Sequence, residues 1–95
     1  MVVSILRFTL ELPGVASLKE KRQVVQSIKH KIQHKFKITV AEVDLQDSLG
    51  FAEMGAAVVS NSRSFGESVL QKALRMAEDQ GGGRLRDPEI FSEIY

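Results

Sequence analysis

The order in which two hydrophobic periodicities follow each other constrains the fold of this chain more than any other feature of its sequence. Alternation of apolar and polar residues is typical of strands that bury one face, and it occurs over residues 2–12, 36–45 and 52–60 and near 88–95. Apolar residues at helical spacing are typical of amphipathic helices, and they occur over 17–34 and from Asn61 or Ser62 onward. The pattern therefore predicts the element order β-α-β-β-α-β.

Turn and cap residues mark the ends of these elements. Pro13 and Gly14 end the first strand. Ser17 and Glu20 have the spacing of a capping box, in which the hydroxyl and the carboxylate each accept a backbone N–H at the start of a helix. A second box and a helix stop are predicted at Ser64 with Glu67 and at Gly81–Gly83.

Each predicted helix has one apolar face. The first presents Leu18, Val24, Val25, Ile28 and Ile32, and the second presents Phe65, Val69, Ala73 and Met76. Lys21 falls within the first of these faces, where an unpaired charge would be costly. It therefore needs either a route for its ammonium group to water or a carboxylate partner.

The element order with short connections predicts an α+β, ferredoxin-like sandwich that forms a single domain over residues 1–95. Right-handed crossovers give a four-stranded antiparallel sheet of order 4-1-3-2 with two helices on one face. In this topology the start of the first helix, the end of the second strand and the start of the fourth meet at one end of the sheet.

Positive charge is concentrated in the first helix. Residues 19–37 contain seven basic residues and one acidic residue, a net of +6 in a chain whose net charge is +1. Such asymmetry is typical of an electrostatic contact with an anionic partner, although a solvated helix face gives the same pattern. The predicted nucleic-acid contacts are Lys19, Arg22, Lys29, Arg84 and Arg86.

A polar cluster is predicted where the first helix begins and the second strand ends. Its members are Lys21, Glu42, Asp44 and Asp47. Glu42 and Asp44 have the inward parity of their strand, so either can pair with Lys21. Three interpretations stay open: a structural salt-bridge network, a polar site for phosphate or RNA, and a catalytic or metal-binding carboxylate site.

Several kinds of chemistry are disfavoured by composition. The chain contains no cysteine, which excludes disulfides and thiolate metal sites and favours the cytoplasm. His30 and His34 are one helical turn apart but lack a third ligand, so we expect no metal and no cofactor. No nucleophile–base arrangement is present, which favours a binding protein over an enzyme. No apolar run is long enough to span a membrane.

The sheet face opposite the helices is predicted to be open and partly apolar. Sheets of this topology that bind RNA stack bases on aromatic residues of the two central strands. The outward positions of the first strand are Val3, Ile5, Arg7 and Thr9, without an aromatic residue. Stacking on this face is therefore disfavoured, and homodimer formation or docking of a partner is favoured.

Four short motifs resemble the bacterial YlxP-like family, a family of unknown function. They are Leu12-Pro13-Gly14, Ser17 to Arg22, Ala41 to Asp44 with Gln46-Asp47, and Val58 to Asn61. The resemblance implies a ferredoxin-like fold, a bacterial cytoplasmic protein, and genes beside those for translation and ribosome maturation. It transfers no catalytic residue. The sequence thus predicts a non-enzymatic RNA- or ribosome-associated protein without DNA sequence readout, or alternatively a homo-oligomeric interaction module.

Overall fold

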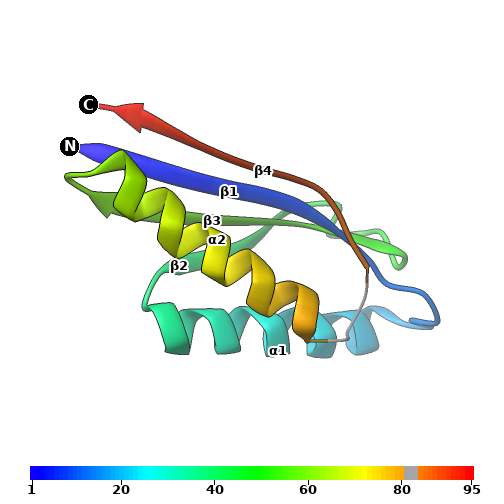
Figure 1. The fold of residues 1–95 in the computed structure, drawn as a ribbon. Helices are drawn as coiled ribbons and strands as arrows, with labels where there is room; N and C mark the ends of the chain where they lie inside the picture. The colour runs from blue at the N-terminus through cyan, green and yellow to red at the C-terminus, as the bar shows by residue number, and fades with distance from the viewer. Residues whose placement is uncertain (81–83) are drawn as a thin grey trace.

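The fold is a two-layer α/β sandwich, described by a computed structural model over residues 1–80 and 84–95. Two helices lie on one face of a four-stranded sheet, and no described element covers the other face (Figure 1). The predicted element order is confirmed. The elements are β1 (Val2–Glu11), α1 (Leu18–Phe36), β2 (Thr39–Asp44), β3 (Phe51–Ser60), α2 (Arg63–Asp79) and β4 (Arg84–Ile94).

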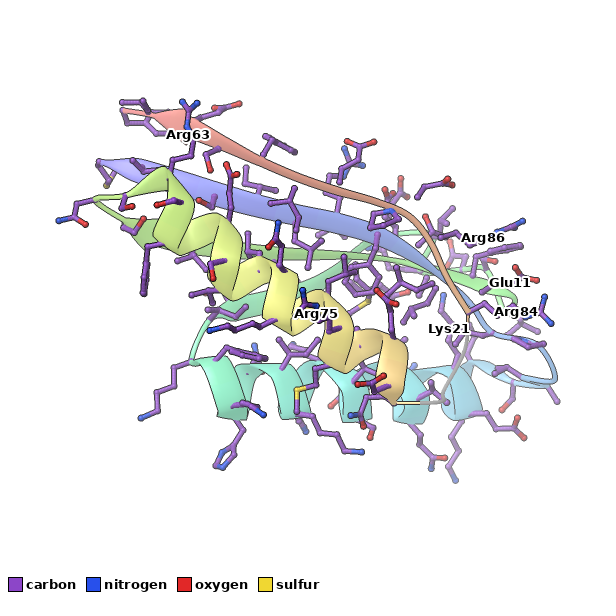
Figure 2. The ribbon with its side chains drawn as sticks, viewed as in Figure 1. Glu11, Lys21, Arg63, Arg75, Arg84 and Arg86 are labelled. Carbon is purple, nitrogen blue, oxygen red and sulfur yellow. The ribbon has the colours of Figure 1, made fainter. Side chains whose placement is uncertain are left out.

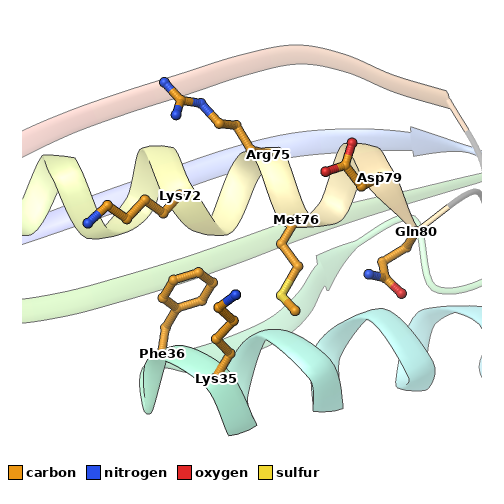
Figure 3. A pocket seen from close by; sticks show the side chains of 7 residues that line it. All are labelled: Lys35, Phe36, Lys72, Arg75, Met76, Asp79 and Gln80. Atoms are coloured by element: carbon orange, nitrogen blue, oxygen red, sulfur yellow. The ribbon is translucent and has the colours of Figure 1, made fainter.

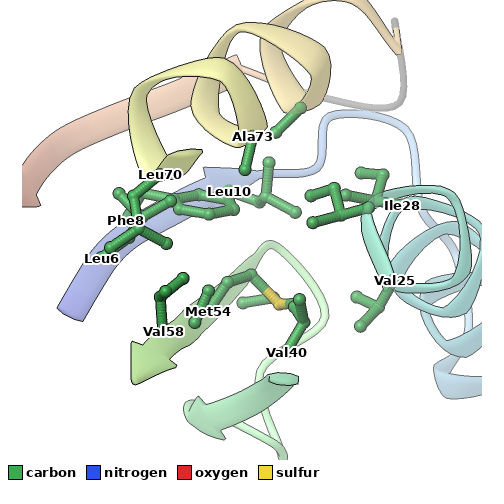
Figure 4. Packing of buried hydrophobic residues seen from close by; sticks show 14 of the residues in the cluster. Leu6, Phe8, Leu10, Val25, Ile28, Val40, Met54, Val58, Leu70 and Ala73 are labelled. Atoms are coloured by element: carbon green, nitrogen blue, oxygen red, sulfur yellow. The ribbon is translucent and has the colours of Figure 1, made fainter. Parts of the chain in front are cut away.

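The sheet has the order β2-β3-β1-β4, which is the predicted order. Every pair of neighbours is antiparallel, and β1 and β3 occupy the centre. β1 alternates as its sequence predicts: Leu6, Phe8 and Leu10 are buried beneath the helices. They pack with Ile28 of α1 and with other apolar residues in one continuous core (Figure 4). Burying this surface is the main contribution to folding free energy.

α1 begins as its capping box predicts. Ser17 is the N-cap, and its hydroxyl accepts the N–H of Glu20 at 3.1 Å. The carboxylate of Glu20 accepts the N–H of Ala16 at 3.0 Å, one residue earlier than in the standard box. The helix continues past the predicted end at His34 and closes at Lys37, whose φ of 55° lies in the left-handed region.

The predicted second capping box is wrong. Ser62 is the N-cap of α2 and accepts the N–H of Phe65 at 3.3 Å. Glu67 instead accepts a hydrogen bond from Ser92 of β4 at 2.6 Å, and Ser92 also bonds the buried Ser4 of β1 at 2.8 Å. A chain of polar contacts therefore joins α2 to two strands.

The buried stripe of α2 also differs from the prediction. Its members are Gly66, Leu70, Ala73 and Ala77, whereas Phe65 is 59% exposed. The reason is close packing near the start of the helix: a Cβ at Gly66 would collide with Ser4, so glycine at this position lets α2 lie directly on β1. The predicted glycine stop lies outside the described residues, and α2 ends at Asp79.

β4 begins four residues earlier than predicted and contains an irregularity. Its register with β1 shifts between Arg7 and Thr9, where Asp87 has a φ of 51° and precedes Pro88. At the other end of the molecule the terminal amine of Met1 donates to the carbonyl of Tyr95 at 3.0 Å. Neither described helix is long and apolar enough to cross a membrane.

Candidate functional site

The ammonium group of Lys21 lies in a cage of oxygen atoms between α1 and the β2–β3 loop. Its side chain is 3% exposed. Nζ donates to the carbonyl oxygens of Leu45 at 2.7 Å and Ser48 at 2.6 Å, with that of Gln46 at 3.5 Å. Carbonyl oxygens stabilise a buried cation as charge-assisted hydrogen-bond acceptors. Lys21 therefore fixes the loop to the helix.

Of the two candidate carboxylate partners, the structure selects Glu42. Its Oε2 lies 3.0 Å from Nζ of Lys21. Among the described residues this buried oxygen accepts no hydrogen bond of good geometry. The ion pair with Lys21 therefore compensates for the loss of its contact with water. Asp44 follows a register shift in β2, is exposed, and accepts the N–H of Leu45 at 2.7 Å.

A hollow of about 240 Å³ adjoins the cage, with Arg22 and Asp47 on its wall. The three ammonium protons of Lys21 already point to oxygen atoms of the chain, so none is left for a ligand. This geometry favours the structural interpretation of the polar cluster. It gives no support to an enzyme that uses Lys21.

Arg84 and Arg86 join this end of the molecule, as the topology predicts. Figure 2 shows both, with Glu11, at the same end of the molecule as Lys21. Arg86 forms an ion pair with Glu11 at 3.3 Å and remains largely exposed. Their Cα partners on β1 are Thr9 and Glu11, whose side chains point away from the helices. They therefore lie on a different face from the outer surface of α1.

Charge is separated between the two layers of the sandwich. α1 and α2 together carry nine basic and four acidic residues, a net of +5. The rest of the chain carries four basic and eight acidic residues, a net of −4. Two of the four helical acids are engaged, since Glu20 caps α1 and Glu67 binds Ser92. The helical layer is thus the positive side of the molecule.

Three hollows follow one another along the helical layer, and we call them together the helical seam. The first, of about 320 Å³, is lined by Lys19, Arg22, Gln23 and Gln26. The second, of about 250 Å³, shares Gln23 with the first and adds Gln80 from the end of α2. The third, of about 390 Å³, shares Gln80 with the second. The seam therefore runs from the start of α1 to its end.

The third hollow has three of the five basic residues of the seam and one acidic residue, Asp79. Lys35 and Phe36 of α1 lie opposite α2, whose Lys72 and Arg75 also line the hollow, with the guanidinium group of Arg75 directed away from α1 (Figure 3). Nζ of Lys35 lies 5.9 Å from the centre of the Phe36 ring, within the range of a cation–π contact. Met76 and Asp79 complete its wall.

Sequence reasoning missed Lys72 and Arg75, because only the packing of α2 against α1 brings them near Lys35. Their spacing of three residues does place them together on the polar face of a helix, which was the available clue. The predicted contacts Lys19 and Arg22 lie in the first hollow. Lys29 is a half-buried residue of the same helix.

Comparison with known proteins places the chain in a family. The sequence profile described as protein of unknown function (DUF503) matches residues 3–90. This chain belongs to the DUF503 family. The uncharacterized protein YlxP of Bacillus subtilis strain 168 is 41% identical over 58 residues, which are 61% of this chain and 63% of that protein. The matched segment spans less than two thirds of that relative, and the YlxP-like resemblance is confirmed.

No group of three metal-ligating side chains is found in this DUF503 chain within residues 1–80 and 84–95. His30 and His34 are both exposed on α1. The described surface therefore offers two features: a positive helical seam and an apolar open sheet face.

Proposed function

We propose that this protein is a non-enzymatic RNA-binding protein, associated with the ribosome or its maturation, that contacts RNA through the helical seam. One observation carries the proposal: the three connected hollows of the seam are bordered by five basic side chains. These are Lys19, Arg22, Lys35, Lys72 and Arg75. The translation-related gene neighbourhood that the YlxP-like resemblance implies supports RNA as the anionic partner.

The dimensions of the seam suit a nucleic-acid backbone. Lys19 and Lys35 are separated by 16 residues of α1, which correspond to about 24 Å at roughly 1.5 Å per residue. Phosphates along one strand of a B-form DNA duplex are about 3.4 Å apart along the axis, and on this scale the seam spans roughly seven of them. Lysine and arginine neutralise phosphates, and this neutralisation supplies most of the affinity of non-specific binding.

The neutral side chains of the seam favour RNA over DNA. Gln23 and Gln26 lie between the basic ends, where their amides are able to bond sugar hydroxyls as well as phosphates. The 2′-hydroxyl is the group that distinguishes RNA from DNA. The ring of Phe36 is half-buried and borders the third hollow, so it offers an edge on which one unpaired base can pack.

The test is the affinity for a structured RNA, measured by fluorescence anisotropy over a series of salt concentrations. The double variant Lys72→Gln/Arg75→Gln removes two charges from the seam. Lys37→Gln/Arg63→Gln removes two exposed charges outside it and serves as the matched control. We expect the seam variant to reduce the salt slope by about 1 to 2, because each phosphate contact contributes about 0.9. The control should bind as the wild type does.

Two outcomes contradict the proposal. If the affinity for RNA does not fall as the salt concentration rises, the protein does not bind RNA through its phosphates. Equal weakening by the seam variant and its control means that net charge, not the seam, governs binding. Separate variants at the predicted contacts, Arg22→Gln with Lys29→Gln and Arg84→Gln with Arg86→Gln, then show whether the seam alone or also the sheet end contacts RNA.

A further inference from the structure

The uncovered face of the sheet is mainly apolar around Val3 and Ile5, with Glu93 beside Val3, and is charged from the row of Arg7 onward. Its outward residues form rows across the strands, since the register of each pair is known. One row contains Thr39, Ala57, Ile5 and Phe91, from β2 to β4. On one side of it Val59 and Val3 are paired, and Val59 is 67% exposed. An exposed apolar surface that is continuous over several strands typically marks a contact surface.

One half of this face is hollow. A shallow depression of about 380 Å³ lies over β2 and β3, with small residues at its floor: Ala41, Gly55 and Ala57. Val43 forms one of its walls. A Cβ on Gly55 would lie 3.1 Å from Cγ1 of Val43, so glycine at this position lets the valine lean over the neighbouring strand. The depression is therefore a consequence of particular small residues.

The other half of the face carries a partly exposed aromatic ring. Phe91 of β4 is 37% exposed. Ile5 of β1 pairs with Ala57 on one side and with Phe91 on the other. The depression and the ring thus lie at the same height on opposite sides of β1. An isologous dimer needs this kind of self-complementary surface.

We propose that two copies of this chain form a homodimer by packing their open sheet faces together around a two-fold axis that runs along β1. Rotation by 180° about such an axis exchanges the two sides of β1. Phe91 of each copy then lies over Ala57 of the other and fills the depression between Gly55 and Ile5. The ring of one copy closes the hollow of its partner, and the reverse contact is identical.

The polar row next to this contact is compatible with the same axis. Arg7 is ion-paired with Glu53 at 2.8 Å, and Glu89 is its Cα partner on β4. Two copies therefore bring together two guanidinium groups and four carboxylates, so each cation keeps carboxylate neighbours when water is excluded. The face carries both signs of charge, which suits a second copy better than a uniformly charged partner.

The available area is sufficient for a dimer. Four strands at about 4.8 Å spacing and ten residues at about 3.3 Å give a face of roughly 600 Å². Two copies bury roughly 1,200 Å², the lower limit of stable specific interfaces. Pairing through the edge of β4 is less suitable, because Pro88 lacks an N–H and Asp87 interrupts the register. In the face-to-face dimer both helical layers point outward.

The test is sedimentation equilibrium of the full chain over a range of concentrations. We expect a mass of twice 10.6 kDa that falls toward 10.6 kDa on dilution. Phe91→Ala should raise the dissociation constant about 100-fold or more, because a central aromatic contact is lost twice in a symmetric dimer. Ala57→Glu should have a similar effect, since it places a charge at the floor of the depression. The matched control is Gln26→Glu on α1.

Circular dichroism identifies any variant that fails to fold. Phe91 lies at an exposed site on an edge strand, so the Phe91→Ala variant still tests the dimer if Ala57→Glu does not fold. A wild-type chain that stays at 10.6 kDa at the highest concentration overturns the proposal. So does a dimer that Phe91→Ala leaves intact. The inference is independent of RNA binding: a monomer that binds RNA through the seam refutes the dimer alone, and a dimer that ignores RNA refutes the proposed function alone.

Discussion

Replacing Lys21 with methionine tests the interpretation of the polar cluster as a structural clamp. The variant Lys21→Met keeps an apolar stem of similar length in the core face of α1 and removes the ammonium group. The carbonyl of Ser48 then loses its donor, that of Leu45 keeps only the N–H of Ser48 at 3.0 Å, and the buried Oε2 of Glu42 loses its counter-ion. Oε2 of Glu42 is buried and has little compensation once Nζ is gone.

The expected loss is a large fraction of the total stability. Removing one partner of a buried ion pair typically costs about 3–5 kcal/mol. A chain of this length has a free energy of unfolding of roughly 5–14 kcal/mol, from about 0.05–0.15 kcal/mol per residue. With a urea dependence of about 1–1.5 kcal/mol per molar, the unfolding midpoint should fall by roughly 2–5 M.

The assay is urea denaturation followed by circular dichroism, with Lys19→Met as the matched control. Lys19 lies on the same helix but is exposed, so its replacement should change the free energy of unfolding by less than about 0.5 kcal/mol. Glu42→Gln separates the two parts of the cage. Glu42 is partly exposed and keeps a polar side chain in this variant, so we expect a loss of only about 1 kcal/mol.

Two results refute the reasoning. A loss of less than about 1 kcal/mol for Lys21→Met means that water replaces the ammonium group in the cage. An equal loss for Glu42→Gln and Lys21→Met means that the ion pair, and not the set of backbone carbonyls, holds the loop.

Two further predictions concern other contacts. Gly66→Ala should destabilise the protein by about 1–3 kcal/mol in the same urea assay, because the new methyl group collides with Ser4; Ser4→Gly in the same chain should restore part of the loss, and a neutral Gly66→Ala variant contradicts the close approach of α2 to β1. The hydrogen bond and negative charge of Glu93 raise the pKa of Tyr95 above 10.0. Since Tyr95 is the single tyrosine and tryptophan is absent, the absorbance of the phenolate reports this pKa directly, and Glu93→Gln should lower it. Because the folded chain favours the protonated phenol, the contact between Tyr95 and Glu93 contributes to the stability of the fold below pH 10. This contribution disappears as the pH rises through the raised pKa of Tyr95. An unchanged titration in the Glu93→Gln variant contradicts the contact.

The sequence was sufficient for the fold because its local patterns and its topology agree. The alternation in β1, the cap at Ser17 and the right-handed crossovers are short-range or general constraints, and together they determine the strand order. They also predicted that Lys21 requires a partner. The buried stripe of α2 was not predictable in the same way, since Gly66 is buried through close contact with a distant strand and not through its own hydrophobicity.

By itself the sequence determined a basic first helix, an acidic second strand that ends nearby, and an open sheet face without central aromatic residues. Only the tertiary structure decided that Glu42 and not Asp44 pairs with Lys21, because a register shift turns Asp44 outward. It also brought Lys72 and Arg75 to the end of α1, and Phe91 to the opposite side of β1 from the small residues of β3. These juxtapositions depend on the packing of elements far apart in the chain. The periodicity of the sequence indicates on which face of its helix or strand a residue lies, but not which residues of other elements it contacts.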